Sequence, residues 1–187
     1  MTSGSAAAGV RPPSAALADL VRSRMRDVAD FPEPGVVFKD FSPLLADGHA
    51  FAALVDDVAT RYTGRVDVVA GIEARGFIVG AAAAYRMGLG FVLVRKGGKL
   101  PGATYAVDYE LEYGAATLEV HTDAFTPGQR VLIIDDVLAT GGTAAATCEL
   151  VERVGGVVTA IECVLELSFL HGRERLAGRE VSAVVTI

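Results

Sequence analysis

The sequence predicts an α/β fold, with one domain built on a mostly parallel central sheet and helices on both faces. Short apolar runs at 66–70, 91–94 and 131–134 alternate along the chain with longer segments of helical periodicity. The chain has 187 residues, of which 51% are hydrophobic and 21% charged. That length supports one proper core, and that composition excludes a disordered protein.

Charge and hydropathy narrow the classes of partner. The formal net charge is -6 and the pI is near 5.1, which argues against a nucleic-acid-binding protein. No apolar run reaches membrane-spanning length, so we expect no membrane association. Residues 1–13 are small and polar and lack the apolar centre of a secretory signal. We therefore expect a flexible leader at 1–13, a single domain at 14–187 and a cytoplasmic protein.

The cysteines and histidines predict neither a disulfide nor a metal site. Cys148 and Cys163 form no CxxC motif, and each lies among apolar neighbours. We expect two buried thiols in a reducing compartment. The histidines, which are His49, His121 and His171, are isolated from one another. None of them lies at metal-ligand spacing.

The N-terminal elements are a helix and an irregular apolar segment. Leu17, Leu20, Val21, Met25 and Val28 recur at helical spacing, which predicts a helix over 14–29. Residues 31–45, named the hood here, contain three prolines and a glycine, which exclude a regular helix or a central strand. The hood is nevertheless apolar, so it covers either a satellite cluster of the core or a flat aromatic ligand.

The middle of the chain predicts two strand–loop–helix units. We expect a helix from near Asp47 to Tyr62, a strand at 66–70, a helix at 77–87 and a strand at 91–94. The first loop holds Arg75 between two glycines. The second, 95–102, is named the basic loop and contains Arg95, Lys96 and Lys99. Both loops suit an anion, although a solvated turn is the alternative. Residues 104–114 predict a loop or mobile hairpin, and 117–120 a strand.

The stretch 131–143, VLIIDDVLATGGT, carries the strongest functional signal. Four apolar residues predict a buried strand, Asp135 and Asp136 follow it, and a helix begins near Ala144. The intervening Ala139–Thr143, named the phosphate loop, can bring backbone N–H groups and two hydroxyls to a phosphate at a helix N-terminus. The carboxylates would repel a phosphate but suit ribose hydroxyls. The alternative is an ordinary turn, and no Walker lysine or GxGxxG is present.

The last third of the chain completes the alternation. We expect a helix over 143–154, a strand over 157–165 interrupted by Glu162, and a strand over 181–187. In a parallel sheet the loops that leave the strands' carboxyl ends lie on one rim. The phosphate loop, the Arg75 loop and the basic loop should therefore converge, as a substrate with phosphates at both ends requires.

Five segments in this order resemble one family. They are FPEPGVVFKDFSPLL, GIEARGF, VRKGGKLPG, YELEYG and VLIIDDVLATGGT. The last is similar to the phosphoribosyl-diphosphate motif of type I phosphoribosyltransferases. The whole set, from about residue 31 to 175, resembles the adenine phosphoribosyltransferases among them. The resemblance implies that fold, a mobile loop at about 97–116 and a homodimer. It also implies purine salvage, in which adenine and 5-phosphoribosyl 1-diphosphate give AMP and diphosphate with Mg²⁺.

The resemblance also implies residue roles. Asp135 and Asp136 would hold the ribose, and Arg75, Lys96 and Lys99 the diphosphate. The 5′-phosphate would bind Ala139, Thr140, Gly141, Gly142 and Thr143. Adenine would contact Val37, Phe38, Lys39 and Leu167. Glu112 would be the catalytic acid or base near the purine imidazole ring, and Mg²⁺ would be held mainly through the substrate.

One departure and two alternatives remain at this point. Gly97 stands where many relatives carry a further basic residue, which removes a cation near the diphosphate. A purine-responsive regulator would share the central motif, but it needs a DNA-binding segment, and only one helix precedes the hood. An enzyme for xanthine, guanine or hypoxanthine would differ in the hood and near Leu167.

Overall fold

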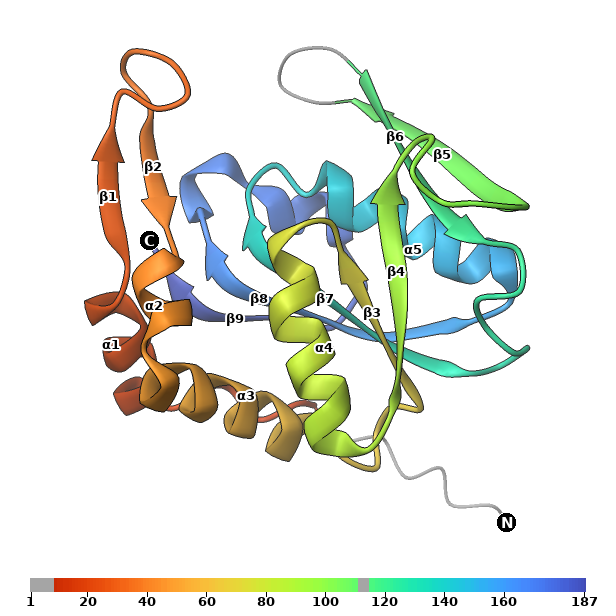
Figure 1. Cartoon of the computed structure of the whole chain (residues 1–187), viewed down its shortest axis with the longest axis horizontal. Coiled ribbons are helices and arrows are strands. Elements are labelled where there is room, and N and C mark those ends of the chain that lie inside the picture. The colour runs from red at the N-terminus through yellow and green to blue at the C-terminus, as the bar shows by residue number, and fades with distance from the viewer. Residues whose placement is uncertain (1–8, 111–114) are drawn as a thin grey trace.

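The fold is built on one seven-stranded sheet in the order β5-β6-β4-β3-β7-β8-β9, as the computed structural model shows for residues 9–110 and 115–187 (Figure 1). Strands β4, β3, β7, β8 and β9 are parallel, and β6 and β5 add an antiparallel edge. The predicted mostly parallel sheet is confirmed. The bounds are β3 Val68–Ile72, β4 Gly90–Lys96, β5 Thr104–Glu110, β6 Ala115–His121, β7 Arg130–Leu138, β8 Val157–Glu166 and β9 Val181–Thr186.

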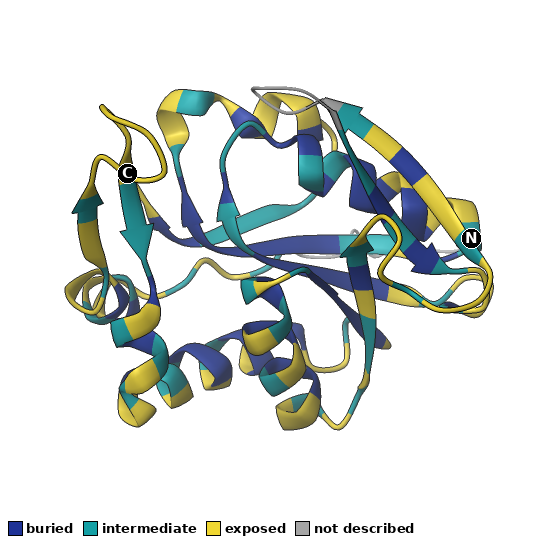
Figure 2. Ribbon diagram, turned by 45° about the horizontal axis from the view of Figure 1, so that its top comes forward, coloured by how far each residue is buried: buried dark blue, intermediate teal, exposed yellow. Residues whose placement is uncertain are grey.

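Helices cover both faces of this sheet, as the alternating pattern predicted. Helices α1, α3 and α4 pack on one face and share a core cluster that includes Leu54 and Val79. Helix α5 packs on the other face, where Leu150 joins a second cluster. The central strands between them are the most buried part of the chain (Figure 2). The bounds are α1 Ala15–Ser23, α2 Ser42–Ala46, α3 Gly48–Tyr62, α4 Arg75–Met87 and α5 Gly142–Val154, with 3₁₀ turns η1 Ser168–Leu170 and η2 Gly172–Leu176.

The first helix ends earlier than its periodicity predicted. Ser14 caps α1 through a hydrogen bond from Leu17 N, but the helix stops at Ser23. Residues Arg26–Ala29 instead form β1, which pairs antiparallel with β2, Val37–Asp40. The prediction of a helix to residue 29 is therefore wrong, because the pairing of β1 with β2 overrides the helical spacing of Met25 and Val28.

The hood is more regular than its prolines suggested. Its residues contribute β2 to a two-stranded sheet that stands apart from the main sheet, and they also form the short helix α2 (Figure 1). Pro43 lies in the first turn of α2, where the missing N–H costs nothing. The prediction that no regular helix forms here is wrong for these five residues, whereas the exclusion of a central strand is confirmed.

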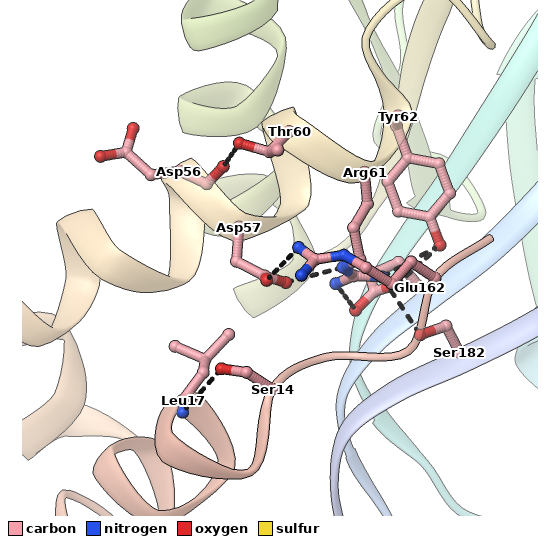
Figure 3. Close-up of polar contacts among 10 residues, drawn as sticks. Ser14, Leu17, Asp56, Asp57, Thr60, Arg61, Tyr62, Glu162 and Ser182 are labelled. Atoms are coloured by element: carbon pink, nitrogen blue, oxygen red, sulfur yellow. Dashed lines mark hydrogen bonds and ion pairs between the residues drawn. The ribbon is translucent and has the colours of Figure 1, made fainter.

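A buried ion pair explains why Glu162 interrupts the apolar run of β8. Arg61 of α3 donates from Nη1 and Nη2 to the Glu162 carboxylate at 2.7 Å each (Figure 3). Tyr62 Oη donates to the same carboxylate at 2.7 Å, and Arg61 Nε reaches Asp57 at 2.6 Å. Ser182 of β9 accepts from Arg61 at 3.2 Å. The network fixes α3 against β8 and β9.

Both cysteines are buried and unpaired, as predicted. Burial raises the pKa of the Cys148 thiol to about 11. In the described ranges 9–110 and 115–187, no helix has the length and apolar character needed to cross a membrane.

Candidate active site

The phosphate loop joins β7 to α5 at the predicted place, but both flanking elements are longer than predicted. β7 continues through the two aspartates to Leu138, because it pairs with β8 as far as Leu138 opposite Glu166. α5 begins at Gly142 rather than near Ala144. The aspartates therefore lie within the C-terminal part of β7, and the pairing of β7 with β8 holds their backbone in place.

A small cavity of about 50 Å³ lies at this loop. It exceeds the roughly 10–15 Å³ that one water molecule requires. Backbone N–H groups at the start of α5 and the hydroxyls of Thr140 and Thr143 suit an anion there. The lining brings the five predicted phosphate residues together with Asp135, Val137, Leu138, Ala144 and Cys163.

The two aspartates lie in different surroundings. Asp135 is only 8% exposed and accepts a hydrogen bond from Asp136 N at 2.8 Å. Burial, and then the charge of Asp136, raise the pKa of the Asp135 carboxyl well above its ordinary value. Asp136 instead forms an ion pair with the guanidinium of Arg75. The two carboxyl groups thus differ in burial and in their charged partners.

Arg75 was predicted to lie in a loop. It is instead the first residue of α4. The close approach of α4 to β7 places it beside Asp136, since a Cβ on Gly76 would lie 2.7 Å from Ile134 O. The guanidinium also lies 5.1 Å from the ring of Phe38 and 5.7 Å from that of Phe41. Arg75 thereby connects the hood to the aspartate pair.

Glu73 organises the basic loop, and the sequence reasoning did not include it. Lys99 Nζ donates to Glu73 at 2.6 Å, Arg95 Nε at 3.3 Å and Lys96 N at 3.0 Å. The hydrogen bond from Lys99 is the main reason why the pKa of Glu73 falls to about 2. An acid two residues before Arg75 was visible in GIEARG, but its partners come from the next strand–loop unit.

Gly97 lies where the basic loop meets β6. Its N–H donates to Thr117 O at 2.9 Å. A Cβ at this position would lie 3.2 Å from the Cβ of Thr117, so a larger residue would require a small shift of the neighbouring strand.

The hood forms a second pocket of about 220 Å³ on the same rim. It brings together the four residues predicted for adenine and adds Val36, Arg75, Val137 and Leu165. The Lys39 ammonium pairs with Asp27 across the β1–β2 hairpin at 2.7 Å, so its charge is balanced by a residue that precedes the hood. Val137 and Leu165 were missed, because no sequence motif marks either residue, and their place in the pocket depends on the hood, which comes from another part of the chain.

Glu112 lies outside the described residues, so the predicted catalytic position remains a prediction. The flanking residues 104–110 and 115–121 form the antiparallel hairpin of β5 and β6. Of the two structures predicted for 104–114, the hairpin is found on the described residues.

Comparison with known proteins gives one family. Residues 45–177 match the phosphoribosyl transferase domain. An adenine phosphoribosyltransferase of Salinispora tropica is 61% identical over 91% of both chains, and one of Streptomyces coelicolor is 56% identical over 91% of this chain and 97% of its own. The crystal structure of the Thermoanaerobacter pseudethanolicus enzyme is 46% identical, with a TM-score of 0.88 over 91% of this chain and 99% of its own. The Saccharomyces cerevisiae enzyme, solved with adenine and an imino-altritol bisphosphate, is 36% identical, with a TM-score of 0.86 over 91% of this chain and 99% of its own. This chain therefore belongs to the adenine phosphoribosyltransferases.

Proposed function

We propose that this chain transfers the 5-phosphoribosyl group from 5-phosphoribosyl 1-diphosphate to adenine, giving AMP and diphosphate in purine salvage. One observation carries the proposal beyond family membership. Val137 lines both the phosphate-loop cavity and the hood pocket. The two cavities are therefore neighbours, and the aspartates lie directly before Val137 on β7. A nucleotide with its phosphate on the loop and its base under the hood would place its ribose at the aspartates.

The hood pocket suits a flat purine. The Phe38 ring and the apolar side chains of Val37, Leu165 and Leu167 line it. We assign reading of the adenine edge to backbone groups of Val37 and Lys39, as the family resemblance implies. A site that donates and accepts on that edge leaves a 6-oxo purine with unpaired buried groups.

The cations would stabilise the departing diphosphate, because breaking the bond at the ribose anomeric carbon leaves negative charge on the leaving group. Arg75, Lys96 and Lys99 are assigned to that anion. Arg75 pairs with Asp136, and Lys99 pairs with Glu73. These ion pairs hold both cations at the rim, where they would bind the diphosphate. A carboxylate at Glu112 would take up the imidazole proton that adenine loses when its N9 joins the ribose.

Mg²⁺ is the implied metal, and the carboxylates of the site fit the way it is commonly bound. Within residues 9–110 and 115–187 no cluster of three or more His, Cys, Asp or Glu could hold a metal. Mg²⁺ is often bound through one or two carboxylates together with substrate phosphates, and Asp135 and Asp136 could supply those carboxylates. When bound, the ion would neutralise charge on the diphosphate.

The remaining assignments concern organisation and location. We assign residues 14–187 to one catalytic domain, with the hood at 31–45 and a mobile loop at about 97–116. The described part of the leader contacts this domain, since Val10 N donates to Glu180 and Arg11 pairs with Asp57 at 3.6 Å. We also propose a cytoplasmic homodimer that binds neither nucleic acid nor membrane. The dimer rests on the family resemblance, and the location on the free thiols, which are typical of a reducing compartment.

The proposal is tested by incubating the protein with 5-phosphoribosyl 1-diphosphate, Mg²⁺ and adenine. We expect equal amounts of AMP and diphosphate, with no AMP when either substrate is omitted. Binding of adenine and AMP without turnover would instead support a ligand-sensing module.

A further inference from the structure

A short turn outside the predicted motifs packs behind the phosphate loop. It comprises His171, which joins the 3₁₀ turns η1 and η2 after β8, and Gly172 and Arg173, the first two residues of η2. Gly172 is buried, and His171 has a φ of 54°. No role was assigned to this turn from the sequence.

The turn and the phosphate loop are in reciprocal backbone contact. A Cβ on Gly172 would lie 2.2 Å from Ala139 O and 3.0 Å from Gly141 N. A Cβ on Gly141 would lie 2.3 Å from Gly172 O. Real Cβ atoms essentially never come closer than 3.0 Å, and the opposing atoms belong to backbone rather than to flexible side-chain ends. Any side chain at either glycine must therefore displace the loop or the turn.

The turn is anchored and has little room to yield. Arg173 donates from Nε and Nη2 to the Glu166 carboxylate at 2.6 and 2.8 Å, and from Nη1 to Val181 O at 2.8 Å. Glu166 is only 6% exposed, at the end of β8. On the far side of the turn, Leu176 is buried in the core beneath α5. A Cβ added at Gly172 would consequently push mainly on the phosphate loop.

We propose that Gly172 is a positioning residue for the 5′-phosphate, an inference that rests on the proposed function. Its backbone sets the orientation of the loop residues Ala139 and Gly141, and hence of the N–H groups that would receive the phosphate. Gly172 would touch no part of the ligand. Sites of this kind require their donors to be held within about 0.5 Å of the productive geometry.

The test compares Gly172→Ala with Gly48→Ala. Gly48 lies in α3, and a Cβ there would meet nothing within 4 Å, so this control carries only the general effect of replacing glycine. The affinities for AMP and for adenosine are measured by calorimetry, because their ratio isolates the 5′-phosphate. We expect Gly172→Ala to lower the AMP-to-adenosine affinity ratio about ten- to a hundredfold, as loss of one hydrogen bond to a charged group predicts. The adenosine affinity itself and the ratio in Gly48→Ala should stay within about twofold of wild type.

A second variant tests the positioning role if Gly172→Ala does not fold. Arg173→Lys retains the charge but loses the bidentate contact with Glu166, so it loosens the turn without adding volume. We expect a smaller fall in the same ratio. If the wild type prefers AMP and a folded Gly172→Ala keeps that preference, the positioning role is overturned while the proposed function stands. An unchanged ratio in Arg173→Lys overturns it when Gly172→Ala does not fold. A wild type that binds AMP no better than adenosine contradicts both the positioning role and the phosphate site.

Discussion

Asp135 and Asp136 are adjacent in sequence, yet the fold gives them opposite electrostatic surroundings. Asp135 is buried beside the phosphate loop, whereas Asp136 is paired with Arg75. Burial favours the protonated carboxyl of Asp135 in the folded chain. Protonated Asp135 therefore contributes its full stability below the pKa of an unfolded aspartate, about 3.9. That stability is lost as the pH rises toward the higher pKa of Asp135 in the folded chain.

We expect Asp135→Asn to raise the melting temperature at pH 7, because the variant has no charge to bury at that position. Below about pH 4 the gain should shrink, since Asp135 is then protonated in both states. Thermal unfolding of wild type and variant across this range measures the difference. A variant that is less stable than wild type at pH 7 would contradict the burial argument.

The same substitution should abolish function when made at both positions. Asp135→Asn with Asp136→Asn should fold but lose nearly all turnover, because the ribose hydroxyls lose both carboxyl groups. Steady-state AMP formation measures this, with circular dichroism as the check on folding. Near-normal activity would remove the ribose-binding role from the pair.

Glu112 carries the prediction for proton transfer. Glu112→Gln should lower kcat by about 10²–10⁴-fold, the usual contribution of general acid–base catalysis. Adenine affinity should change far less. Glu110→Gln, in the same segment, is the control and should be mild. Wild-type kcat in Glu112→Gln, or greater damage in the control, would refute the assignment.

At the residue scale, candidate site residues that lie within one sequence motif can be predicted from the sequence. Residues whose role depends on a contact between two motifs are missed. The aspartates and the phosphate loop are contiguous, so the pattern and the chemistry coincide. Gly172 and Glu73 acquire their importance from Ala139 and Lys99, which are distant in the chain. Single-sequence reasoning offers no signal for such pairings.

At the element scale, the basic loop is held by an acid from the neighbouring strand–helix unit. Glu73 receives hydrogen bonds from Lys99, Arg95 and the backbone of Lys96, and Arg95 also donates to Lys99 O at 3.1 Å. Glu73 therefore positions the cations that are assigned to the diphosphate. The segment 14–29 is a second example, because its helical spacing lies within the segment itself, whereas β1 forms by pairing with β2 across the following turn.

We expect Glu73→Gln to raise the KM for 5-phosphoribosyl 1-diphosphate about tenfold, the cost of losing one hydrogen bond between charged groups, with a smaller change in the KM for adenine. Stability should respond to pH as well. The folded pKa of Glu73 lies at about 2, below the ordinary value of 4.5. Ionised Glu73 thus stabilises the folded chain above about pH 4.5, and this stabilisation is lost as the pH falls toward about 2.

Steady-state kinetics and thermal unfolding between pH 6 and pH 2 test this prediction. Glu149→Gln is the control, since Glu149 forms an exposed ion pair with Arg153 away from the basic loop. An unchanged KM in Glu73→Gln would show that the basic loop does not depend on this anchor. A melting-temperature difference from wild type that persists at pH 2 would contradict the depressed pKa.

At the scale of the whole molecule, stability and function draw on different parts of the fold. The two cavities that hold the residues assigned to phosphate and adenine are neighbours at the carboxyl end of β7, the kind of place where ligands bind in this class of fold. The Arg61–Glu162 network is buried between α3 and the sheet, and it joins the helix layer to the sheet (Figure 3). It includes none of the residues assigned to substrate.

We expect Glu162→Gln to lower the free energy of unfolding by about 3–5 kcal/mol, because it removes the main counter-charge of a fully buried arginine. The KM values should stay near wild type. Urea unfolding measures the change. Glu152→Gln removes one partner of an exposed ion pair with Arg179 and should cost at most about 1 kcal/mol. Equal effects in the two variants would contradict the structural role of the buried pair.

The choice of purine base tests the central claim most directly, because it requires the hood, the aspartates and the phosphate loop to act as one site. The measurement is kcat/KM for adenine and for hypoxanthine at saturating 5-phosphoribosyl 1-diphosphate with Mg²⁺. One mismatched group on the base edge costs about 1–3 kcal/mol, so we expect adenine to be preferred by at least about tenfold, with AMP as the product. Comparable turnover of hypoxanthine, or the absence of AMP from adenine, would contradict the account.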